Sequence, residues 1–235
     1  MSKFPQLLIL VGGMATRLEP LSNRIPKSLI EVQGKPFIFY QLEQAKKRGI
    51  NDVVLCIGNM GNEIFNVIGN GDKFGLNIKY SDEGNNLLGT GGAINNAKHL
   101  LKDYFFVLYG DSWINADYKK MFNKFQLSEN PAIIAVYKNK DKWDKSNIDV
   151  HNKLVTTYKK NHGNKKFNYI DYGLSILTKE LFYNFDKDEK FDLGEVYSYL
   201  SKQKQLEAFE VYDRFYEIGS FQGINETSYN LQKYL

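Results

Sequence analysis

The sequence predicts an α/β fold in which helices cover both faces of a mixed, mostly parallel β-sheet. Four short apolar runs rich in β-branched residues have the length of fully buried strands, and they span residues 7–11, 53–57, 105–109 and 132–137. Segments with the apolar spacing of helices lie between these runs, and such alternation is typical of parallel sheets with helical crossovers. The hydrophobic fraction of 43% is enough for a sizeable core. Since neither a linker nor a repeat divides the sequence, we expect a single domain over residues 1–235.

The first predicted helix covers residues 37–49. Pro36 suits the start of a helix because its fixed φ is already helical, and Gly49 is a typical C-terminal stop. The other segments with helical spacing are 61–71, 91–103, 193–203 and 225–235. Residues 138–177 are less regular and predict short strands joined by polar turns. Within them the Lys- and Asn-rich stretch 138–147 is either a mobile loop over the site or an ordinary surface loop, and we favour the surface loop.

Charge and cysteine content narrow the class of protein. The formal net charge of +4 suits a protein that handles anionic small molecules, although an ordinary solvated surface would also give it, and it is too small to indicate a nucleic-acid partner. Cys56 is the only cysteine, so the chain cannot form an internal disulfide. No apolar stretch reaches the length of a membrane span or of a signal-peptide core. We therefore expect a cytoplasmic protein without a membrane partner, and the sequence does not define its oligomeric state.

The segment after the first predicted strand has the features of a phosphate-binding loop. Gly12 and Gly13 allow the backbone to approach a ligand closely and to present amide N–H groups to it. Arg17 offers a planar fork for two phosphate oxygens, and Lys27, ten residues later, offers a compact charge. The loop has neither the Gly-Lys-Ser/Thr ending of a P-loop nor a G-x-G-x-x-G dinucleotide motif. Taken alone, the segment is best interpreted as a glycine turn with two unrelated surface cations.

A longer match gives this segment a specific interpretation. Residues 12–36, GGMATRLEPLSNRIPKSLIEVQGKP, resemble the signature of the sugar-1-phosphate nucleotidyltransferases, G-G-x-G-T-R-L-x-P-L-T…P-K-P-L. Ala15 stands where the family has glycine, and alanine costs about 1 kcal/mol wherever a positive φ is required. The resemblance implies a Rossmann-like three-layer nucleotidyltransferase fold, with the nucleotide-binding part in residues 1–115 and the sugar-binding part and C-terminal metal segment in residues 116–235. It also implies nucleotide contacts through Val11, Gly12, Gly13 and Thr16.

A second segment, SDEGNNLLGTGGAINNAKHL over residues 81–100, resembles the family stretch that packs beside the nucleotide base. The resemblance implies that Leu88 and Gly89 contact the nucleotide and that Gly91 contacts the sugar. Small residues at these positions let a base edge meet backbone groups directly. A turn followed by a helix would also contain glycines, but it does not account for their order in this segment.

Two carboxylates are candidates for a magnesium site. Asp111 follows the predicted strand 105–109, a place where aspartate is also a common turn residue. In the family this aspartate holds Mg²⁺ against the nucleotide phosphates, and a second carboxylate lies in an Asp-Ile-Gly-Thr segment near the C-terminus. The matching segment here, RFYEIGSFQGINE, has Glu217 and Ser220 in place of the aspartate and the threonine. The resemblance thus implies Mg²⁺ held by Asp111 and Glu217, with Asp111 also beside the nucleotide.

The sugar-binding part matches the family only in patches. Asp171 in YIDYGLSIL stands where the family strand N-A-G-I-Y has an amide that contacts the sugar. LVTTYKK falls where the family has a glutamate-lysine pair, so Lys160 would meet the sugar phosphate while Lys159 replaces the glutamate. The loss of that hydroxyl acceptor puts the usual hexose specificity in question.

The predicted reaction transfers a nucleotidyl group from a nucleoside triphosphate to a sugar-1-phosphate and releases pyrophosphate. The sugar phosphate is already a nucleophile, so the reaction needs positioning and positive charge rather than a general base. We expect Arg17 to grip the β- and γ-phosphates and Lys27 to bridge the α-phosphate and the incoming sugar phosphate. The chain looks most similar to members that use GTP with heptose- or mannose-1-phosphate, whose products feed capsule or lipopolysaccharide synthesis.

Three alternatives stay open at this point. A uridylyl- or cytidylyltransferase for another sugar-1-phosphate would have the same motifs. A non-catalytic nucleotide sensor would explain the departures at Ala15, Lys159 and Glu217. A glycosyltransferase that uses a nucleotide sugar would share the architecture, but GDSW at residues 110–113 lacks the usual Asp-x-Asp pair.

Overall fold

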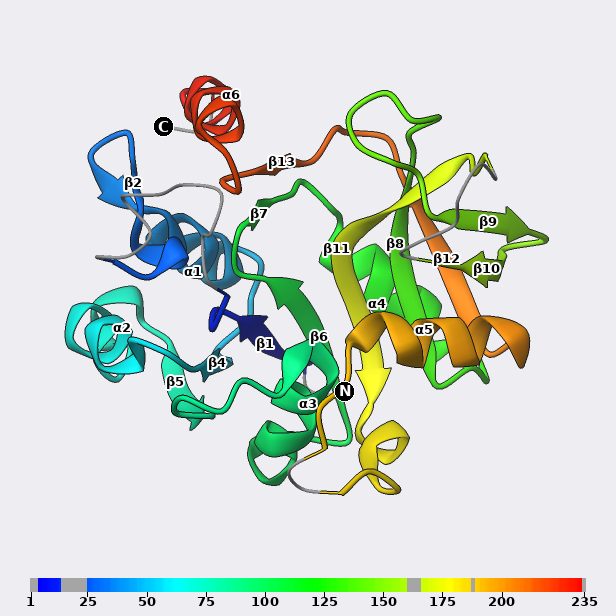
Figure 1. The fold of residues 1–235 in the computed structure, drawn as a ribbon, viewed down its shortest axis with the longest axis horizontal. Coiled ribbons are helices and arrows are strands. Elements are labelled where there is room, and N and C mark those ends of the chain that lie inside the picture. Colours follow the sequence, from blue (N-terminus) through cyan, green and yellow to red (C-terminus); the bar gives the residue numbers. More distant parts are fainter. Residues whose placement is uncertain (1–3, 14–24, 160–165, 187–188, 234–235) are drawn as a thin grey trace.

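A nine-stranded β-sheet organises the computed structural model (Figure 1). The structure describes residues 4–13, 25–159, 166–186 and 189–233. The strand order is β5-β4-β1-β6-β11-β8-β12-β10-β9. The strands are β1 Gln6–Leu10, β4 Asp52–Ile57, β5 Asn77–Asp82, β6 Tyr104–Tyr109, β8 Ala132–Lys138, β9 Ile148–His151, β10 Leu154–Tyr158, β11 Tyr169–Thr178 and β12 Leu206–Val211.

The sheet changes character at β6. Strands β5, β4, β1 and β6 are parallel to one another, so their carboxyl ends meet at one edge. Strand β11 is antiparallel to both β6 and β8, β12 is parallel to β8, and β10 and β9 complete the sheet with antiparallel pairs. The predicted α/β fold with a mixed sheet is confirmed. The sheet was expected to be mostly parallel, but four of its neighbouring strand pairs are parallel and four are antiparallel in the described structure, because the half beyond β6 is built largely of antiparallel pairs. Each of the four predicted strands is present within one residue of its expected bounds.

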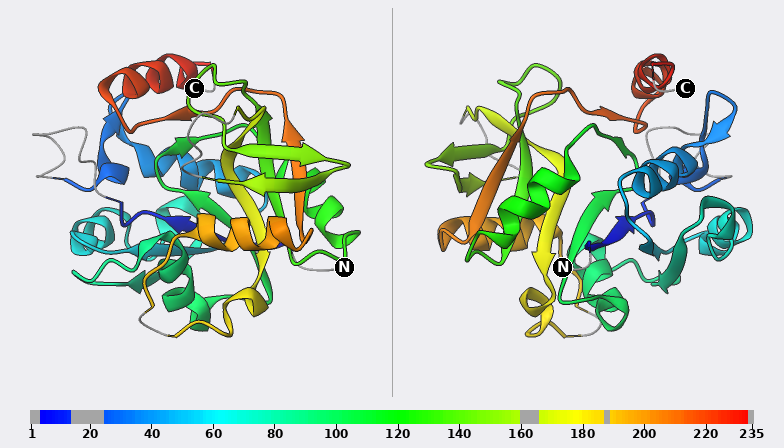
Figure 2. Two further views of the ribbon diagram at one scale, coloured as in Figure 1. Left: turned by 45° about the vertical axis from the view of Figure 1, so that its right-hand side comes forward. Right: turned by 180° about the vertical axis from the view of Figure 1, so that it is seen from behind.

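Helices cover both faces of the sheet, as two further views show (Figure 2). One layer contains α1 (Phe37–Lys47), α2 (Gly61–Ile68) and α4 (Tyr118–Gln126), and the opposite layer contains α3 (Gly89–Asn96) and α5 (Leu193–Lys202). The two cores between these layers and the sheet follow from the period of two along each strand, because successive side chains point to opposite faces.

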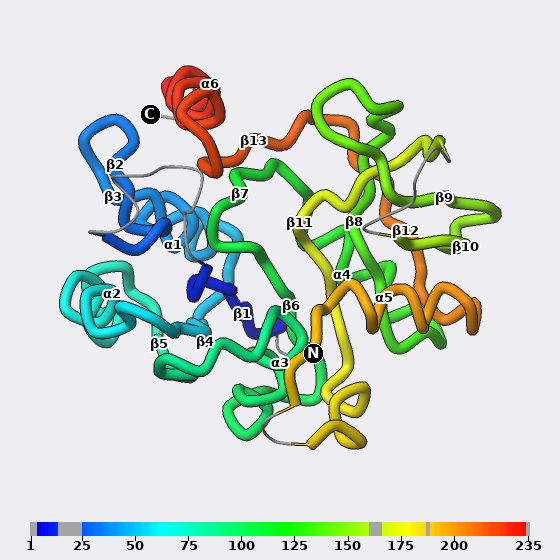
Figure 3. The backbone as a smooth tube through the Cα atoms, in the orientation of Figure 1, coloured from blue at the N-terminus to red at the C-terminus, as the bar shows by residue number. Residues whose placement is uncertain are grey.

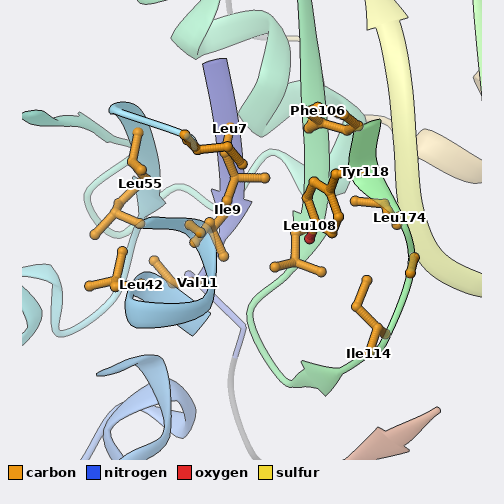
Figure 4. Close-up of a cluster of buried hydrophobic side chains, with 14 of the residues drawn as sticks. Leu7, Ile9, Val11, Leu42, Leu55, Phe106, Leu108, Ile114, Tyr118 and Leu174 are labelled. Atoms are coloured by element: carbon orange, nitrogen blue, oxygen red, sulfur yellow. The ribbon is translucent and has the colours of Figure 1, made fainter. Parts of the chain in front are cut away.

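Strand β1 shows this alternation directly. Leu7 and Ile9 belong to the core beneath α1, α2 and α4, whereas Leu8 belongs to the core beneath α3 and α5. Figure 4 shows part of the first core, in which side chains from β1, α1 and β4 lie together. Leu42 of α1 and Leu55 of β4 are fully buried there, as expected for strands covered on both faces.

Three helices differ from the sequence-based expectation. Helix α6 (Phe221–Leu231) begins four residues before the predicted start at 225, because the Ser220 hydroxyl accepts a hydrogen bond from the Gly223 N–H at 3.0 Å and so caps the helix. Helix α3 begins at Gly89 rather than 91. Helix α4 was not predicted, although the Asp117 carboxylate caps it by accepting from the Lys120 N–H at 2.9 Å.

A small third core joins the two ends of the chain. The strands β7 (Ser112–Trp113) and β13 (Tyr216–Glu217) pair antiparallel, and α6 follows β13 directly. In Figure 3, α6 lies next to the hairpin formed by β2 (Glu31–Val32) and β3 (Lys35–Pro36). The buried members of this core are Ile30, Val32, Phe37, Tyr40, Trp113, Ile218 and Leu231. The C-terminal segment is therefore packed against the residues that follow β6.

In the part of the chain that the structure describes, no helix has both the length and the apolar character needed to cross a bilayer.

Helix α3 approaches the segment before α5 unusually closely. The backbone N–H groups of Gly91 and Gly92 donate to the Phe191 carbonyl at 3.0 and 3.1 Å, and the Phe191 N–H donates to the Leu88 carbonyl at 3.0 Å. A Cβ atom on Gly91 would lie 2.3 Å from the Phe191 ring. Packing of this density has no space for a methyl group, so glycine is required at position 91 for steric reasons.

We expect Gly91→Ala to lower the free energy of unfolding by about 1–3 kcal/mol, because the added methyl group must displace the buried Phe191 ring. Urea unfolding measures the change. Gly13→Ala is the matched control, since a Cβ atom there would meet nothing within 4 Å, and its unfolding curve should resemble that of the wild type. Equal stability of the Gly91→Ala protein and the wild type would contradict the steric argument.

Candidate active site

A cavity of about 340 Å³ lies at the carboxyl ends of the parallel strands. Open α/β sheets bind ligands at this edge because the loops there diverge and leave space. The cavity is lined from the ends of β1, β4, β5 and β6, from α3, and from the segments that carry Lys27 and Asp192. Its lining residues are Leu10, Val11, Gly12, Gly13, Lys27, Ser28, Cys56, Glu83, Leu87, Gly89, Thr90, Ala93, Tyr109, Gly110, Asp111 and Asp192.

Lys27 and Asp111 form an ion pair on the wall of this cavity. Lys27 opens a 3₁₀ turn (Lys27–Leu29), and its Nζ lies 2.5 Å from Asp111 Oδ2. Asp111 follows β6, whose last residue, Tyr109, also lines the cavity. The side chains of Lys27 and Asp111 are 16% and 31% exposed, so both are partly withdrawn from water but open to the cavity. The predicted convergence of a cation with the β6 carboxylate is therefore present.

Glu217 reaches the same place from the other end of the sequence. In the β7–β13 pair Glu217 lies opposite Ser112, and the Ile218 N–H donates to the Asp111 carbonyl at 3.0 Å. A Cβ atom on Gly219 would lie 3.2 Å from Lys27 Nζ and 3.6 Å from Glu217 Oε1. The Lys27 ammonium and the Glu217 carboxylate thus flank Gly219, and the Asp111 carboxylate pairs with the same ammonium.

This donor set fits Mg²⁺. Among the residues that the structure describes, no three His, Cys, Asp or Glu side chains gather closely enough to enclose a metal ion. Mg²⁺ keeps several water ligands and takes one or two carboxylates together with substrate phosphates, so the pair Asp111 and Glu217 suffices. A structural zinc site would need four enclosing protein ligands, which this pair does not supply.

Part of the predicted site falls outside the residues that the structure describes. Thr16, Arg17 and Lys160 all lie there, so their roles remain predictions. Gly12 and Gly13, by contrast, are placed on the cavity wall. A Cβ atom on Gly12 would lie 3.3 Å from the Gly58 nitrogen, which leaves little space for a side chain beside β4.

Glu83, which the sequence analysis did not single out, lines the cavity just after β5. Its Oε1 accepts a hydrogen bond from the Leu88 N–H at 3.1 Å. Burial raises the pKa of the Glu83 carboxyl, and the neighbouring Asp82 adds to this effect, while the Leu88 N–H opposes it. The signal in the sequence is an acidic residue between a strand and a glycine-containing loop, a position otherwise typical of turns.

The predicted base-binding segment is divided between cavity and core. Gly89 lines the cavity with a φ of 77°, a conformation that favours glycine. Leu88 is buried at the start of α3 and is not among the cavity-lining residues. Gly91 is not among them either, since its Cα faces Phe191. Asp192, absent from the sequence prediction, does line the cavity, where its carboxylate accepts from the Thr90 hydroxyl at 3.2 Å.

Asp171 lies on β11, the strand next to β6. Its Oδ2 accepts from the Tyr158 hydroxyl at 3.0 Å and its Oδ1 accepts from the Gly173 N–H at 2.9 Å. Strand β11 bulges between Asp171 and Ser175. Within this bulge Gly173 has a φ of 85° and packs against Ser112 and Tyr109. Burial, reinforced by the Asp171 charge, raises the pKa of the Tyr109 phenol, which stays a hydrogen-bond donor on the cavity wall.

Comparison with known proteins gives consistent matches over the whole chain. The family model described as nucleotidyl transferase matches residues 6–233. A D-glycero-alpha-D-manno-heptose 1-phosphate guanylyltransferase of Campylobacter jejuni subsp. jejuni serotype O:2 is 32% identical over 216 residues, which cover 91% of this chain and 94% of the relative. A protein of the same name from Aneurinibacillus thermoaerophilus is 28% identical over 98% of this chain and 100% of its own length. The crystal structure of HddC from Yersinia pseudotuberculosis complexed with GMP-PN has a TM-score of 0.81 and 26% identity, covering 97% of this chain and 99% of that one.

We expect Glu83→Gln to raise the free energy of unfolding above that of the wild type at pH 7, and the difference to shrink towards pH 5. The folded-state pKa of Glu83 is raised above its unfolded value, so the ionised carboxylate disfavours folding at neutral pH and protonation removes this penalty. Glutamine keeps an oxygen for the Leu88 N–H. Urea unfolding at several pH values measures the difference, and a difference that is independent of pH would argue against a desolvated carboxylate.

Proposed function

The chain belongs to the nucleotidyl transferase family, among the sugar-1-phosphate nucleotidyltransferases, and on this premise we propose that it transfers the guanylyl group of GTP to D-glycero-α-D-manno-heptose 1-phosphate. The products are pyrophosphate and a GDP-activated heptose. The observation that carries the proposal is the distribution of charged side chains in the cavity. Lys27 and Asp111 lie at one end, where β6 stops, and Glu83, which follows β5, lies at the other. The two relatives named as heptose 1-phosphate guanylyltransferases support the choice of substrates.

The end beside β6 suits the phosphates. The backbone at Gly12 and Gly13 is open to the cavity and available to phosphate oxygens. Lys27 is proposed to meet the α-phosphate and the incoming sugar phosphate, because its ammonium pairs with Asp111 and lies next to Gly219, as the Glu217 carboxylate does. Arg17 is the predicted partner of the departing pyrophosphate. Asp111 and Glu217 would hold Mg²⁺, which when bound supplies positive charge to the reacting phosphates.

These groups act by position and charge. A sugar phosphate oxygen attacks the α-phosphorus, the bond to the β-phosphate oxygen breaks, and pyrophosphate leaves with the electron pair. The attacking oxygen carries no proton that must be removed, so the site requires no general base. Lys27 offsets the repulsion between two anions and holds the attacking oxygen in line.

The end beyond β5 suits guanine. The Glu83 carboxylate lies beside the end of β4, since its Oε2 would be 3.8 Å from a Cβ atom on Gly58. Adjacent strands lie about 4.8 Å apart, so the two spacings from β4 to β6 give about 10 Å between the two ends, a span that suits a nucleotide. The guanine edge presents two adjacent donors, N1–H and the 2-amino group, and a carboxylate accepts both. Uracil and thymine instead present one N–H between two carbonyl oxygens, which a carboxylate repels. Glu83 therefore favours GTP over UTP and dTTP.

The sugar part of the proposal rests on the residues beyond β6. Asp171, whose carboxylate is held by Tyr158 and Gly173, is proposed to accept from a sugar hydroxyl. Gly91 would contribute only backbone, since its Cα faces Phe191. Lys160 is proposed to meet the sugar phosphate. We place the reaction in the cytoplasm, and the product's consumers are glycosyltransferases that build capsule or lipopolysaccharide.

Pyrophosphate release from each of four nucleoside triphosphates with several sugar-1-phosphates tests the function. We expect the highest kcat/KM with GTP and the heptose phosphate. When ITP, which lacks the 2-amino group, replaces GTP, kcat/KM should fall by about 10-fold or more, because the Glu83 carboxylate then receives one hydrogen bond fewer. A preference for UTP or CTP would identify a different nucleotidyltransferase, and no turnover with any pair would indicate a nucleotide sensor.

The variant Glu83→Gln separates base recognition from the rest of the site. Glutamine pairs with the N3–H and one carbonyl of uracil, so the ratio of kcat/KM for GTP over UTP should fall by about 100-fold. Asp82→Asn is the control, because Asp82 is absent from the cavity lining, and its ratio should stay near that of the wild type. An unchanged ratio in Glu83→Gln would remove Glu83 from base recognition while leaving the reaction class intact.

Lys27→Ala is expected to lower kcat by about 100- to 1,000-fold, as the removal of one preorganised charge at a reacting centre does in other enzymes. The KM for the sugar phosphate should change much less. Lys35→Ala is the control, because Lys35 pairs with Glu43 outside the cavity, and its kinetic constants should equal those of the wild type. Near-normal turnover by Lys27→Ala would overturn the assigned role.

A further inference from the structure

A stack of three side chains lies beside the strand that carries Glu217. The Arg214 guanidinium carbon lies 3.6 Å from the centre of the Trp143 ring and 4.7 Å from the centre of the Tyr216 ring. Trp143 comes from the loop between β8 and β9, and in Figure 1 this loop runs next to the segment that leads into β13. Contacts of this kind stabilise by about 0.5–2 kcal/mol, more where water is excluded. We call these residues the Arg214 stack.

The loop that presents Trp143 is built to hold it in place. Asn139 and Ser146 are buried, and they hydrogen-bond to each other at 3.1 Å. The backbone N–H of Trp143 donates to Asn139 Oδ1 at 3.2 Å, and the Asp141 carboxylate accepts from the backbone N–H of Ser146 at 2.8 Å. The stretch expected to be a mobile or ordinary surface loop is thus closed by its own hydrogen bonds, and its one large aromatic side chain covers a cation.

The stack is also tied to the helix behind Glu217. Arg214 forms an ion pair with Glu226 of α6, and the Gln222 amide and the Arg214 guanidinium together hold the pKa of the Glu226 carboxyl below its usual value. At the next residue of α6, the Thr227 hydroxyl donates to the Glu217 carbonyl at 3.2 Å. Arg214 Nε is buried and finds no hydrogen-bond acceptor within the described ranges, so stacking and the Glu226 pair are what fix the guanidinium.

We propose that the Arg214 stack is a positioning device: Trp143 and Tyr216 clamp Arg214, which holds β13 and α6 in register and so aims the Glu217 carboxylate at the metal position beside Asp111. The inference rests on the proposed role of Glu217 as a metal ligand. Glu217 is one methylene longer than aspartate, so its carboxylate has an additional rotatable bond to restrain. Removal of side chains that hold a metal ligand in place commonly lowers the affinity of the site for the metal.

The same loop also touches the sugar part of the site. Asn147 Oδ1 accepts a hydrogen bond from the Asp171 N–H at 3.1 Å. Residues 139–147 therefore contact the strand with Asp171 directly, and they reach Tyr216 of the strand with Glu217 through Trp143 and Arg214. The stack therefore joins the two halves of the proposed site through one internally bonded loop.

The test compares Trp143→Ala, Trp143→Phe and the exposed-aromatic control Tyr199→Ala, which alters a residue of α5. Two quantities are measured: the affinity of the protein for Mn²⁺, from the electron paramagnetic resonance signal of free Mn²⁺, and the Mg²⁺ concentration for half-maximal turnover. Trp143→Ala should weaken Mn²⁺ binding by about 10-fold and raise the Mg²⁺ requirement equally. The KM for GTP at saturating metal and the melting temperature should change little, since Trp143 is 40% exposed.

Trp143→Phe keeps a ring over the guanidinium and should restore most of the Mn²⁺ affinity, while Tyr199→Ala should match the wild type. Repeating Trp143→Ala in a Glu217→Gln background tests the route, because a residue that acts through Glu217 has no further effect there. Wild-type Mn²⁺ affinity in Trp143→Ala, alongside weakened binding in Glu217→Gln, would overturn the positioning role alone. Unchanged affinity in Glu217→Gln would instead refute the proposed metal ligand.

Discussion

The constraint on which the rest of this structure depends is that one ammonium and two carboxylates must share a few ångströms of space at the edge of a sheet. Lys27 comes from a turn near the N-terminus, Asp111 from the end of β6, and Glu217 from a two-residue strand near the C-terminus. Exposed charges gain little from such proximity, so the scaffold must impose it. The β7–β13 pair and the hydrogen bond from the Ile218 N–H to the Asp111 carbonyl hold the C-terminal segment, and with it Glu217, next to Asp111.

The opposite end of the cavity is governed by a different balance. Glu83 is partly desolvated and anchored by the Leu88 N–H, so its remaining acceptor capacity is directed rather than dispersed into water. Between the two ends the wall is apolar, formed by residues such as Cys56 and Ala93. Burial raises the pKa of the Cys56 thiol, which therefore behaves as a small hydrophobic side chain and not as a nucleophile. A flat base with one polar edge fits such a wall, because it buries its faces and exposes its donors at a single point.

Much of the fold could be predicted from the sequence, because buried parallel strands appear as continuous apolar runs. Helix α4 was missed although its sequence carries the helical spacing of one buried face, formed by Tyr118, Met121, Phe122 and Phe125. The predicted start of α6 lay too far along the chain, because Ser220 can cap the helix only where β13 ends just before it. Lys27, Asp111 and Glu217 were predicted as site residues from the family resemblance, and the structure brings Lys27 and Asp111 into contact. Glu83 and Asp192 were not predicted, because an acidic residue at a turn becomes a cavity residue only through tertiary packing. Gly91 was assigned to the sugar, although steric contact with Phe191 already requires a glycine there.

The contact between α3 and the segment before α5 has a mechanical consequence. The Gly91 and Gly92 N–H groups and the Leu88 carbonyl all bond to the backbone of Phe191, and they hold the next residue, Asp192, beside Thr90 on the cavity wall. Separating α3 from the segment before α5 would break these backbone hydrogen bonds. We therefore expect this part of the cavity wall to accommodate substrates of different size by side-chain rotation rather than by movement of the backbone.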